Sequence, residues 1–296
     1  MASLSETLST ARARLVAAGI KPDEAAVDVD VYARTILGWD EATLLANLRE
    51  PTPQPLEPRF SEWVARRERR EPTAYIVGTR EFWGRAFLVT PAVLVPRPET
   101  EFIVEEAMPL VRDLDAPRIA DIGTGSGILA VTLAAELPAA TVIATDLSGA
   151  ALHVARANAE RHGVAERVTF VNTSYLDGAD GVFDLVVANP PYVRDGDKPA
   201  LSRDVRHEPD VALFGGPDGL RDVSGVLDAA VAKVRPGGWF VMEFGLGQED
   251  DVRRLVKGRP ALRVDHVRDD LQGIARTAVV QKRVNSQPPT TDSQAD

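Results

Sequence analysis

The run Asn189-Pro190-Pro191-Tyr192 contains the residue types best suited to chemistry in this sequence. The Asn189 side-chain oxygen and the Pro190 carbonyl can each accept one N–H hydrogen bond from an amide or exocyclic amino group. Such a planar nitrogen is a poor nucleophile because its lone pair is delocalised. Two acceptors would fix it, favour a tetrahedral geometry and direct its lone pair at a sulfonium methyl, so the gain is positioning and preorganised electrostatics.

The remaining residues of the run support this interpretation. Pro191 keeps residue 190 out of helical geometry, and the Tyr192 ring can stack on a flat substrate group. Two prolines can also simply end a strand, but that does not explain the flanking Asn and Tyr. We therefore expect Asn189, Pro190 and Tyr192 to be catalytic, and all four residues of the run to bind substrate.

A glycine-rich segment, Asp121-Ile122-Gly123-Thr124-Gly125-Ser126-Gly127, follows an apolar run and precedes a helical pattern. Glycines let a backbone approach a ligand closely. The dinucleotide fingerprint needs a small residue at position 128, where Ile128 stands, and the sequence has no Gly-Lys-Ser/Thr phosphate loop. The segment therefore predicts a ligand without a pyrophosphate; a tight turn without any ligand is the alternative.

Asp146 follows the next apolar run, 19 positions after Gly127. A carboxylate there can accept hydrogen bonds from both ribose hydroxyls of a nucleoside. It could instead cap the following helix, but Ser148 can do so itself. The segment and Asp146 together favour an adenosine-bearing ligand. The expected cofactor-binding residues are Gly123, Thr124, Gly125, Ser126, Gly127 and Asp146.

Alternating patterns from about residue 96 would position these side chains. Strand-like runs alternate with helical stretches, which is typical of a doubly wound, mostly parallel sheet. The expected strands are 119–122, 142–145, 168–171, 185–188 and 239–244, and the expected helices are 126–136, 148–162 and 219–234. Two further strands, 262–268 and 275–283, are joined by too short a loop for a parallel crossover and should be antiparallel. We predict an α/β fold with a seven-stranded, Rossmann-like sheet.

The first part of the chain has a different pattern. Apolar residues recur at helical spacing from Leu4 to about Arg70, without a strand pattern, which predicts a small helical bundle. Short strands are expected at Tyr75–Gly78 and Phe87–Val89, around Phe82-Trp83-Gly84. The expected organisation is a helical substrate-recognition domain (1–73), a β-hairpin linker (74–95), a catalytic domain (96–284) and a disordered polar tail (285–296).

Composition narrows the class of protein. The 296 residues include no Cys, which excludes disulfides and thiolate chemistry, and no apolar run is long enough to span a membrane. No secretory signal precedes the first helix, so we expect a cytoplasmic protein. The four His are scattered, and we expect no metal. A net charge of −10 argues against stable nucleic-acid binding.

With these motifs in order, the chain resembles the protein-(glutamine-N5) methyltransferases that modify class I peptide-chain release factors. The resemblance runs from about residue 60 to 283. It includes the glycine-rich segment, Asp146 and the Asn-Pro-Pro-Tyr run, and further matches at Glu71–Gly78, Phe82–Gly84, Val93–Glu101, Glu208-Pro209 and Gly215–Leu220. The Val93–Glu101 stretch is particular to this group.

The resemblance implies a class I methyltransferase that uses S-adenosylmethionine and a helical domain that helps hold the release factor. The implied substrate is the glutamine of a Gly-Gly-Gln loop. It places Tyr175 beside the adenine and Asn189 close to the methyl donor as well as the substrate amide. The family often has an acidic residue before that aromatic, where this chain has Ser174.

Charged residues elsewhere are weaker candidates. Arg97, Glu99 and Glu101 could line the cofactor or glutamine pocket, or form structural ion pairs. The run Arg66–Arg70 could guide an acidic partner or ribosomal RNA, although such runs are usually solvated helix faces.

Three alternative functions stay open at this point. The same run could hold an adenine or cytosine amino group of DNA or RNA, which would have to be unpaired or flipped out. The target could be a glutamine of a ribosomal protein, against which the Arg97–Glu101 stretch weighs. The chain could also be a cofactor-binding scaffold without turnover, but the intact Asn189 motif argues against this.

Overall fold

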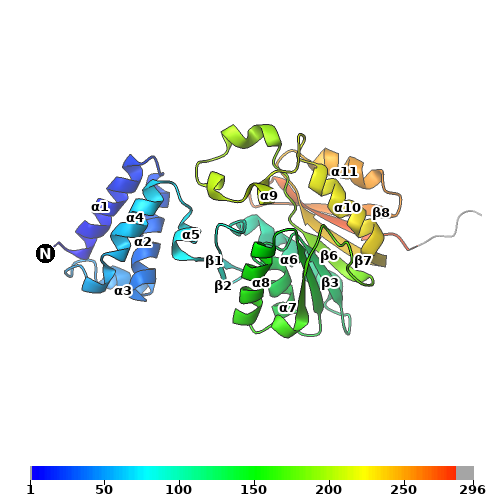
Figure 1. The fold of residues 1–296 in the computed structure, drawn as a ribbon, viewed down its shortest axis with the longest axis horizontal. Helices are drawn as coiled ribbons and strands as arrows, with labels where there is room; N and C mark the ends of the chain where they lie inside the picture. Colours follow the sequence, from blue (N-terminus) through cyan, green and yellow to red (C-terminus); the bar gives the residue numbers. More distant parts are fainter. Residues whose placement is uncertain (1, 285–296) are drawn as a thin grey trace, which may run out of the picture. The chain divides into compact units, whose positions relative to one another are not determined.

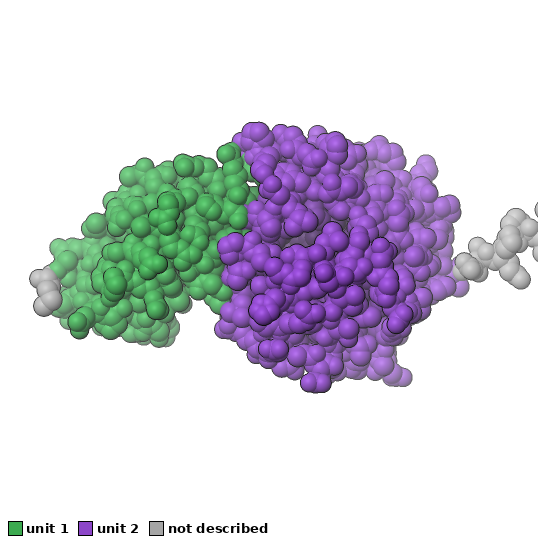
Figure 2. Space-filling model, viewed as in Figure 1, with its two compact units in different colours: residues 1–79, 201–207 green, residues 80–200, 208–296 purple. Residues whose placement is uncertain are grey.

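The computed structural model describes residues 2–284, so the predicted tail at 285–296 lies outside the described residues. The described chain forms two compact units (Figure 2). The first contains residues up to Thr79 together with 201–207, and the second contains 80–200 and 208–284. The short segment 201–207 therefore belongs with the amino-terminal helices, although it comes from the middle of the sheet-forming sequence.

The first unit is built from helices, as the periodicity predicts. Its elements are α1 (Leu4–Ala17), α2 (Pro22–Leu37), α3 (Glu41–Ala46), η1 (Gln54–Leu56), α4 (Arg59–Glu68) and α5 (Thr73–Val77). Ser3 and Glu6 form a reciprocal capping box at the start of α1. Pro22 opens α2, and Gly38 closes it in the left-handed conformation. Leu8, Val29 and Phe60 bury their side chains in one shared core.

The predicted strand at Tyr75–Gly78 is wrong. These residues form the single turn α5, which Pro72 precedes and Gly78 ends with a φ of 84°. Three consecutive buried residues fit either a strand or a helix, so their apolar character alone could not decide. The predicted hairpin does follow, with β1 at Thr79–Phe82 and β2 at Arg85–Leu88, and Trp83 and Gly84 connect the two strands.

The second unit contains a seven-stranded sheet in the order β5-β4-β3-β6-β7-β9-β8 (Figure 1). Its strands are β3 (Arg118–Ile122), β4 (Thr141–Asp146), β5 (Val168–Asn172), β6 (Phe183–Ala188), β7 (Val234–Glu243), β8 (Leu262–Asp269) and β9 (Ala275–Lys282). The first five are parallel, and β9 pairs antiparallel with both β7 and β8. The predicted fold class and antiparallel final pair are both confirmed.

Helices cover both faces of the sheet (Figure 1). They are α6 (Glu101–Val111), α7 (Ile128–Glu136), α8 (Gly149–Arg161), α10 (Arg221–Lys233) and α11 (Glu249–Lys257), with the short α9 (Asp210–Leu213) and 3-10 turns at Pro98–Thr100 (η2), Ala165–Arg167 (η3), Asp195–Ala200 (η4) and Val205–His207 (η5). Successive strand residues point to opposite faces. Ile119 accordingly packs with α6 and α7, whereas Ala120 packs with α10 and α11.

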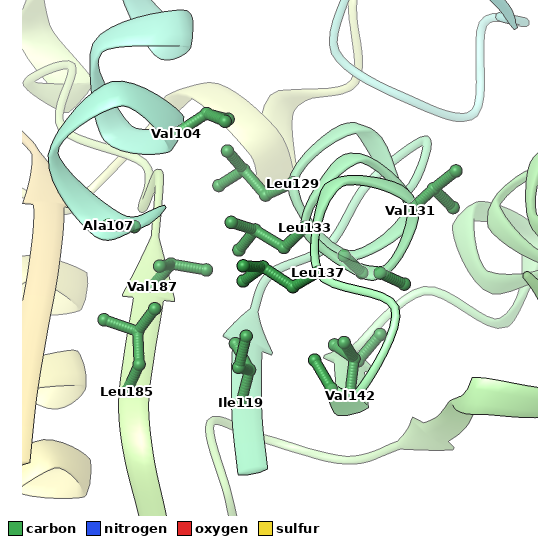
Figure 3. Packing of buried hydrophobic residues seen from close by; sticks show 14 of the residues in the cluster. Val104, Ala107, Ile119, Leu129, Val131, Leu133, Leu137, Val142, Leu185 and Val187 are labelled. Atoms are coloured by element: carbon green, nitrogen blue, oxygen red, sulfur yellow. The ribbon is translucent and has the colours of Figure 1, made fainter. Parts of the chain in front are cut away.

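Figure 3 shows the first of these layers. Leu129 and Leu133 of α7 and Leu137, which follows its last residue, extend towards Val187 and Ile119 on the sheet, and all are buried. Interdigitated aliphatic packing of this kind makes a rigid platform. Loops at the ends of these strands are therefore held in place by the core beneath them.

Candidate cofactor and substrate site

The predicted site residues follow the ends of adjacent parallel strands. Ile122 of β3 is paired with Thr145 of β4 and with Ala188 of β6. Ala188 is in turn paired with Met242 of β7. The residues one position further along, Gly123, Asp146, Asn189 and Glu243, consequently form a row across four strands at the carboxyl edge of the sheet, where ligands bind in such folds.

The glycine-rich segment turns sharply between β3 and α7. Gly123, Gly125 and Gly127 have φ values of 70°, 55° and 84°, a region that residues with a Cβ rarely adopt. A Cβ on Gly125 would meet nothing within 4 Å, whereas one on Gly127 would lie 3.1 Å from the Ala155 Cβ of α8. The positive φ therefore favours glycine at all three positions. At Gly127, the close packing of α7 against α8 is a second reason for glycine.

Asp146 is held by backbone N–H groups on both carboxylate oxygens. Gly125 N donates to Oδ2 at 2.9 Å and Ser148 N donates to Oδ1 at 2.8 Å. Burial raises the pKa of this carboxyl, and these two hydrogen bonds oppose that shift. Ser148 caps α8 through its own side chain, as predicted. Each Asp146 oxygen retains capacity to accept a further hydrogen bond, as two ribose hydroxyls would require.

Tyr175 lies in a constrained turn after β5. Its φ is 48°, which is uncommon for a residue with a side chain and is often found at functional sites. The hydroxyl donates to Asp222 Oδ1 at 3.0 Å, and burial and this carboxylate raise the Tyr175 pKa to about 12. A Cβ on Gly225 would lie 2.2 Å from the ring, so α10 approaches the ring closely because residue 225 is glycine.

The Asn189 amide is fixed by two acceptors. Its Nδ2 donates to Thr100 Oγ1 at 3.0 Å and to Glu243 Oε2 at 3.1 Å. Thr100 donates its own hydroxyl proton to the same Glu243 oxygen at 2.8 Å. Since Nδ2 is engaged, Oδ1 is the end of the amide available to accept a hydrogen bond from a ligand.

The backbone of the Asn-Pro-Pro-Tyr run is packed closely by glycines. A Cβ on Gly215 would lie 2.4 Å from the Pro191 oxygen, and one on Gly219 would lie 2.3 Å from the Tyr192 oxygen. Gln248 Nε2 also donates to the Tyr192 oxygen at 3.2 Å. The glycines of the 215–220 stretch therefore have a physical function, which is to let the chain fold against this run.

A cavity of about 380 Å³ brings most of the predicted residues together. The predicted residues in its lining are Gly123, Thr124, Gly125, Ser126, Asp146, Tyr175, Asn189, Pro190, Pro191 and Arg97. Gly127, Tyr192, Glu99 and Glu101 are not among the lining residues. The Tyr192 hydroxyl instead donates to Glu243 Oε1 at 3.0 Å, and burial raises its pKa.

Comparisons with known proteins show the family of this chain. The PrmC N-terminal domain family matches residues 6–78, and the Methyltransferase small domain family matches residues 102–208. A release factor glutamine methyltransferase from Bradyrhizobium diazoefficiens is 41% identical over 285 residues, which cover 95% of each chain. One from Moorella thermoacetica is 39% identical over 286 residues, covering 95% of this chain and 99% of that relative.

The chain belongs to the release factor glutamine methyltransferase family. The resemblance read from the motifs is therefore confirmed. Solved structures are more distant: a methyltransferase from Pyrococcus furiosus has a TM-score of 0.52 at 18% identity and covers 68% of this chain and 90% of its own. The hMettl16 catalytic domain, in complex with MAT2A 3'UTR hairpin 6, has a TM-score of 0.56 at 17% identity, with 73% and 81% covered. At such low identity these likenesses show the fold alone.

The Arg97–Glu101 stretch contributes both to the lining of the cavity and to internal contacts. Arg97 lines the cavity and pairs with the buried Glu208 at 2.5 Å. Glu101 accepts a hydrogen bond from the Trp83 backbone at 2.8 Å, a structural contact. Within this stretch, Thr100 is the residue that accepts a hydrogen bond from Asn189; it is 1% exposed and is not among the predicted site residues.

Sequence reasoning also missed Glu243, Leu147 and Asp222. Glu243 is a lone carboxylate in an apolar strand, and this is a signal for a buried polar role. Leu147 directly follows Asp146, lines the cavity and is 62% exposed, so it offers an apolar surface there. Asp222 lines the cavity beside Tyr175, but nothing in its helical sequence marks it.

The basic run Arg66–Arg70 is not the solvated helix face that its composition suggests. Arg67 is 4% exposed and pairs with Asp28 at 2.6 Å and with Asp204 at 2.8 Å. Arg70 also pairs with Asp204 at 2.6 Å. These arginines hold segment 201–207 within the first unit, so much of their charge is committed to internal ion pairs.

Residues 2–284 contain neither a membrane-spanning helix nor a cluster of metal ligands. No helix there is both long enough and apolar enough to cross a membrane. No group of three or more His, Asp or Glu residues in this range is arranged to hold a metal ion.

Proposed function

We propose that this protein transfers a methyl group from S-adenosylmethionine to the side-chain amide nitrogen of the glutamine in the Gly-Gly-Gln loop of class I release factors. The observation that carries the proposal is the held Asn189 amide. Its nitrogen is engaged by Thr100 and Glu243 while the residue lines the same cavity as the glycine-rich segment and Asp146. Family membership supplies the class of substrate.

The residues of the cavity fit the methyl donor. Asp146 would accept from the ribose hydroxyls, and Tyr175 and Leu147 would flank the adenine with an aromatic ring and an apolar side chain. The glycine-rich segment would let its backbone approach the amino-acid end of the donor. When bound, the donor would supply an electrophilic methyl group on a sulfonium.

The chain itself would orient the glutamine amide. Asn189 Oδ1 and the Pro190 carbonyl would each accept one N–H of the substrate amide, directing the nitrogen lone pair at the methyl group. The nitrogen gains the methyl and loses one proton to solvent, and the donor leaves as a neutral thioether. The rate gain rests on alignment and fixed dipoles, because no side chain needs to remove a proton beforehand.

We propose that the helical unit recognises the release factor. Its match to the PrmC N-terminal domain family supports a role particular to this group of methyltransferases. Segment 201–207 belongs to that unit and continues directly into Glu208, the partner of the cavity-lining Arg97. A substrate that is a translation factor would place the reaction in the cytoplasm.

The test is methyl transfer from labelled donor to a purified release factor, read by mass spectrometry of the Gly-Gly-Gln peptide. One added methyl on the glutamine is expected, and none on a factor whose glutamine is replaced by asparagine. Asn189→Ala should lose transfer by about 100-fold or more while still binding the donor. Transfer to RNA or DNA but not to the factor would instead support a base-modifying enzyme.

A further inference from the structure

Glu243 is the last residue of β7 and lies directly behind the Asn-Pro-Pro-Tyr run. It is 2% exposed and is not among the residues that line the cavity. Its carboxylate accepts three hydrogen bonds: from Thr100 at 2.8 Å and Asn189 at 3.1 Å on Oε2, and from Tyr192 at 3.0 Å on Oε1. One buried group therefore holds both ends of the run.

The surroundings of this carboxylate are costly for a charge. Burial raises the pKa of Glu243, Glu99 adds to the rise, and hydrogen bonds from Thr100 and Tyr192 oppose it. Arg276 of β9 also lowers the pKa, but its guanidinium is paired with Asp270 at 3.2 Å. An apolar side chain would fill such a position at a lower desolvation cost, so stability alone gives a weak reason for Glu243.

We propose that Glu243 is a positioning residue that sets which end of the Asn189 amide faces the substrate, an inference that rests on the proposed function. The oxygen and nitrogen ends of an Asn side chain have nearly the same shape but opposite hydrogen-bonding roles. Rotation of the amide by half a turn would place Oδ1 against Glu243 Oε2, acceptor against acceptor. It would also present N–H groups to the substrate amide where acceptors are needed.

Thr100 reinforces the same orientation. Its hydroxyl proton is donated to Glu243, so only its lone pairs face Asn189, and they too require a donor. The chain Glu243–Thr100–Asn189 is therefore polarised in one direction from the buried carboxylate outwards. Tyr192, held by the other carboxylate oxygen, fixes the far end of the run rather than stacking in the cavity.

Two substitutions of similar volume separate the acceptor from the charge. In Glu243→Gln, the amide oxygen can accept from Thr100 and Asn189 while its nitrogen donates to the Tyr192 oxygen, so Asn189 keeps its orientation. Glu243→Met offers no comparable acceptor. We expect Glu243→Gln to keep kcat within about 5-fold of wild type and Glu243→Met to lose about 10- to 100-fold, with donor Kd and release-factor KM within about 2-fold.

Two smaller substitutions test the same inference in case Glu243→Met does not fold. Thr100→Val removes one of the two acceptors for Asn189 and should lower kcat by about 3- to 10-fold. Thr132→Val is the matched control, because Thr132 is buried in α7 and its hydroxyl has no hydrogen-bond partner among the described residues. It should leave kcat unchanged.

The outcomes separate cleanly. Wild-type kcat in Glu243→Met, or equal losses in the Gln and Met variants, would overturn the inference. If Glu243→Met does not bind the donor, Thr100→Val against Thr132→Val decides in the same assay. Failure of the wild-type protein to methylate the factor at all would contradict the proposed function instead, since every comparison here is made relative to wild-type transfer.

Discussion

Asp121 offers a test of how burial shapes the glycine-rich segment. Within residues 2–284 it forms no ion pair. Its Oδ2 accepts hydrogen bonds from Thr124 Oγ1 at 2.6 Å and from Ala130 N at 3.1 Å, and its Oδ1 has no partner among these residues. Complete burial raises its pKa from 3.8 to about 7. Asp121→Asn keeps the accepting oxygen and removes the charge.

The sign of the effect follows from proton linkage. Between pH 3.8 and about 7 the folded protein holds a proton that the unfolded chain releases, so stability falls as pH rises through this window and is level above it. One pKa unit corresponds to about 1.4 kcal/mol. The interval from about pH 5.5 to this pKa is about 1.5 pH units. The free energy of unfolding of the wild-type protein should therefore fall by about 2 kcal/mol between about pH 5.5 and 8.5 because of Asp121.

Hydrogen exchange of the β3 amides measures the stability of this unit without relying on whole-chain unfolding. Asp121→Asn should be stabilised relative to wild type by about 2 kcal/mol more at about pH 8.5 than at about pH 5.5. The exposed Asp115→Asn removes the same formal charge and should follow wild type at both values. A constant difference between Asp121→Asn and wild type across this range would refute the reasoning.

Two further predictions concern packing in each unit. Gly225→Ala should push the Tyr175 ring out of place, since the new Cβ would lie 2.2 Å from it, and weaken donor binding by about 5- to 20-fold in calorimetry. Because alanine favours the helix by about 0.5–1 kcal/mol, an unaltered affinity together with raised stability would contradict this role for the ring. Asp28→Asn should destabilise the helical unit by about 1.5–3 kcal/mol in hydrogen exchange, because it removes one of the two carboxylates that pair with the buried Arg67 and leaves Asp204 as the other. The exposed Asp23→Asn is its control. Equal hydrogen-exchange protection of the helical unit in the two variants would refute a stabilising role for the Asp28–Arg67 pair.

The fold could be predicted because its pattern is local. Apolar runs alternate with helical periodicity, so strands, helices and even the antiparallel final pair could be inferred from neighbouring residues. The exceptions had ambiguous local signals. Helix α11 buries Val252 and Val256 and is otherwise largely charged, and α6 contains Pro109, so neither was predicted.

The site could be predicted only where one motif contains its own chemistry. Asn189 and Pro190 are adjacent, and Asp146 follows a strand at a recognisable spacing from the glycines, so their place in one cavity could be predicted from the sequence. The partners of Asn189 are different: Thr100 is 89 residues before it and Glu243 is 54 residues after it. Nothing in the sequence alone indicates that three such distant positions share one hydrogen-bond chain.

Strand register explains how those distant positions meet. Ala188 is paired with Met242, so Asn189 and Glu243 leave neighbouring strands at the same level. Thr100 reaches them from the turn just before α6, whose apolar face packs on the same sheet. The orientation of the Asn189 amide therefore depends on the register between β6 and β7 and on how α6 packs against the sheet. A shift in either would disturb the chemistry while leaving the Asn-Pro-Pro-Tyr run itself unchanged.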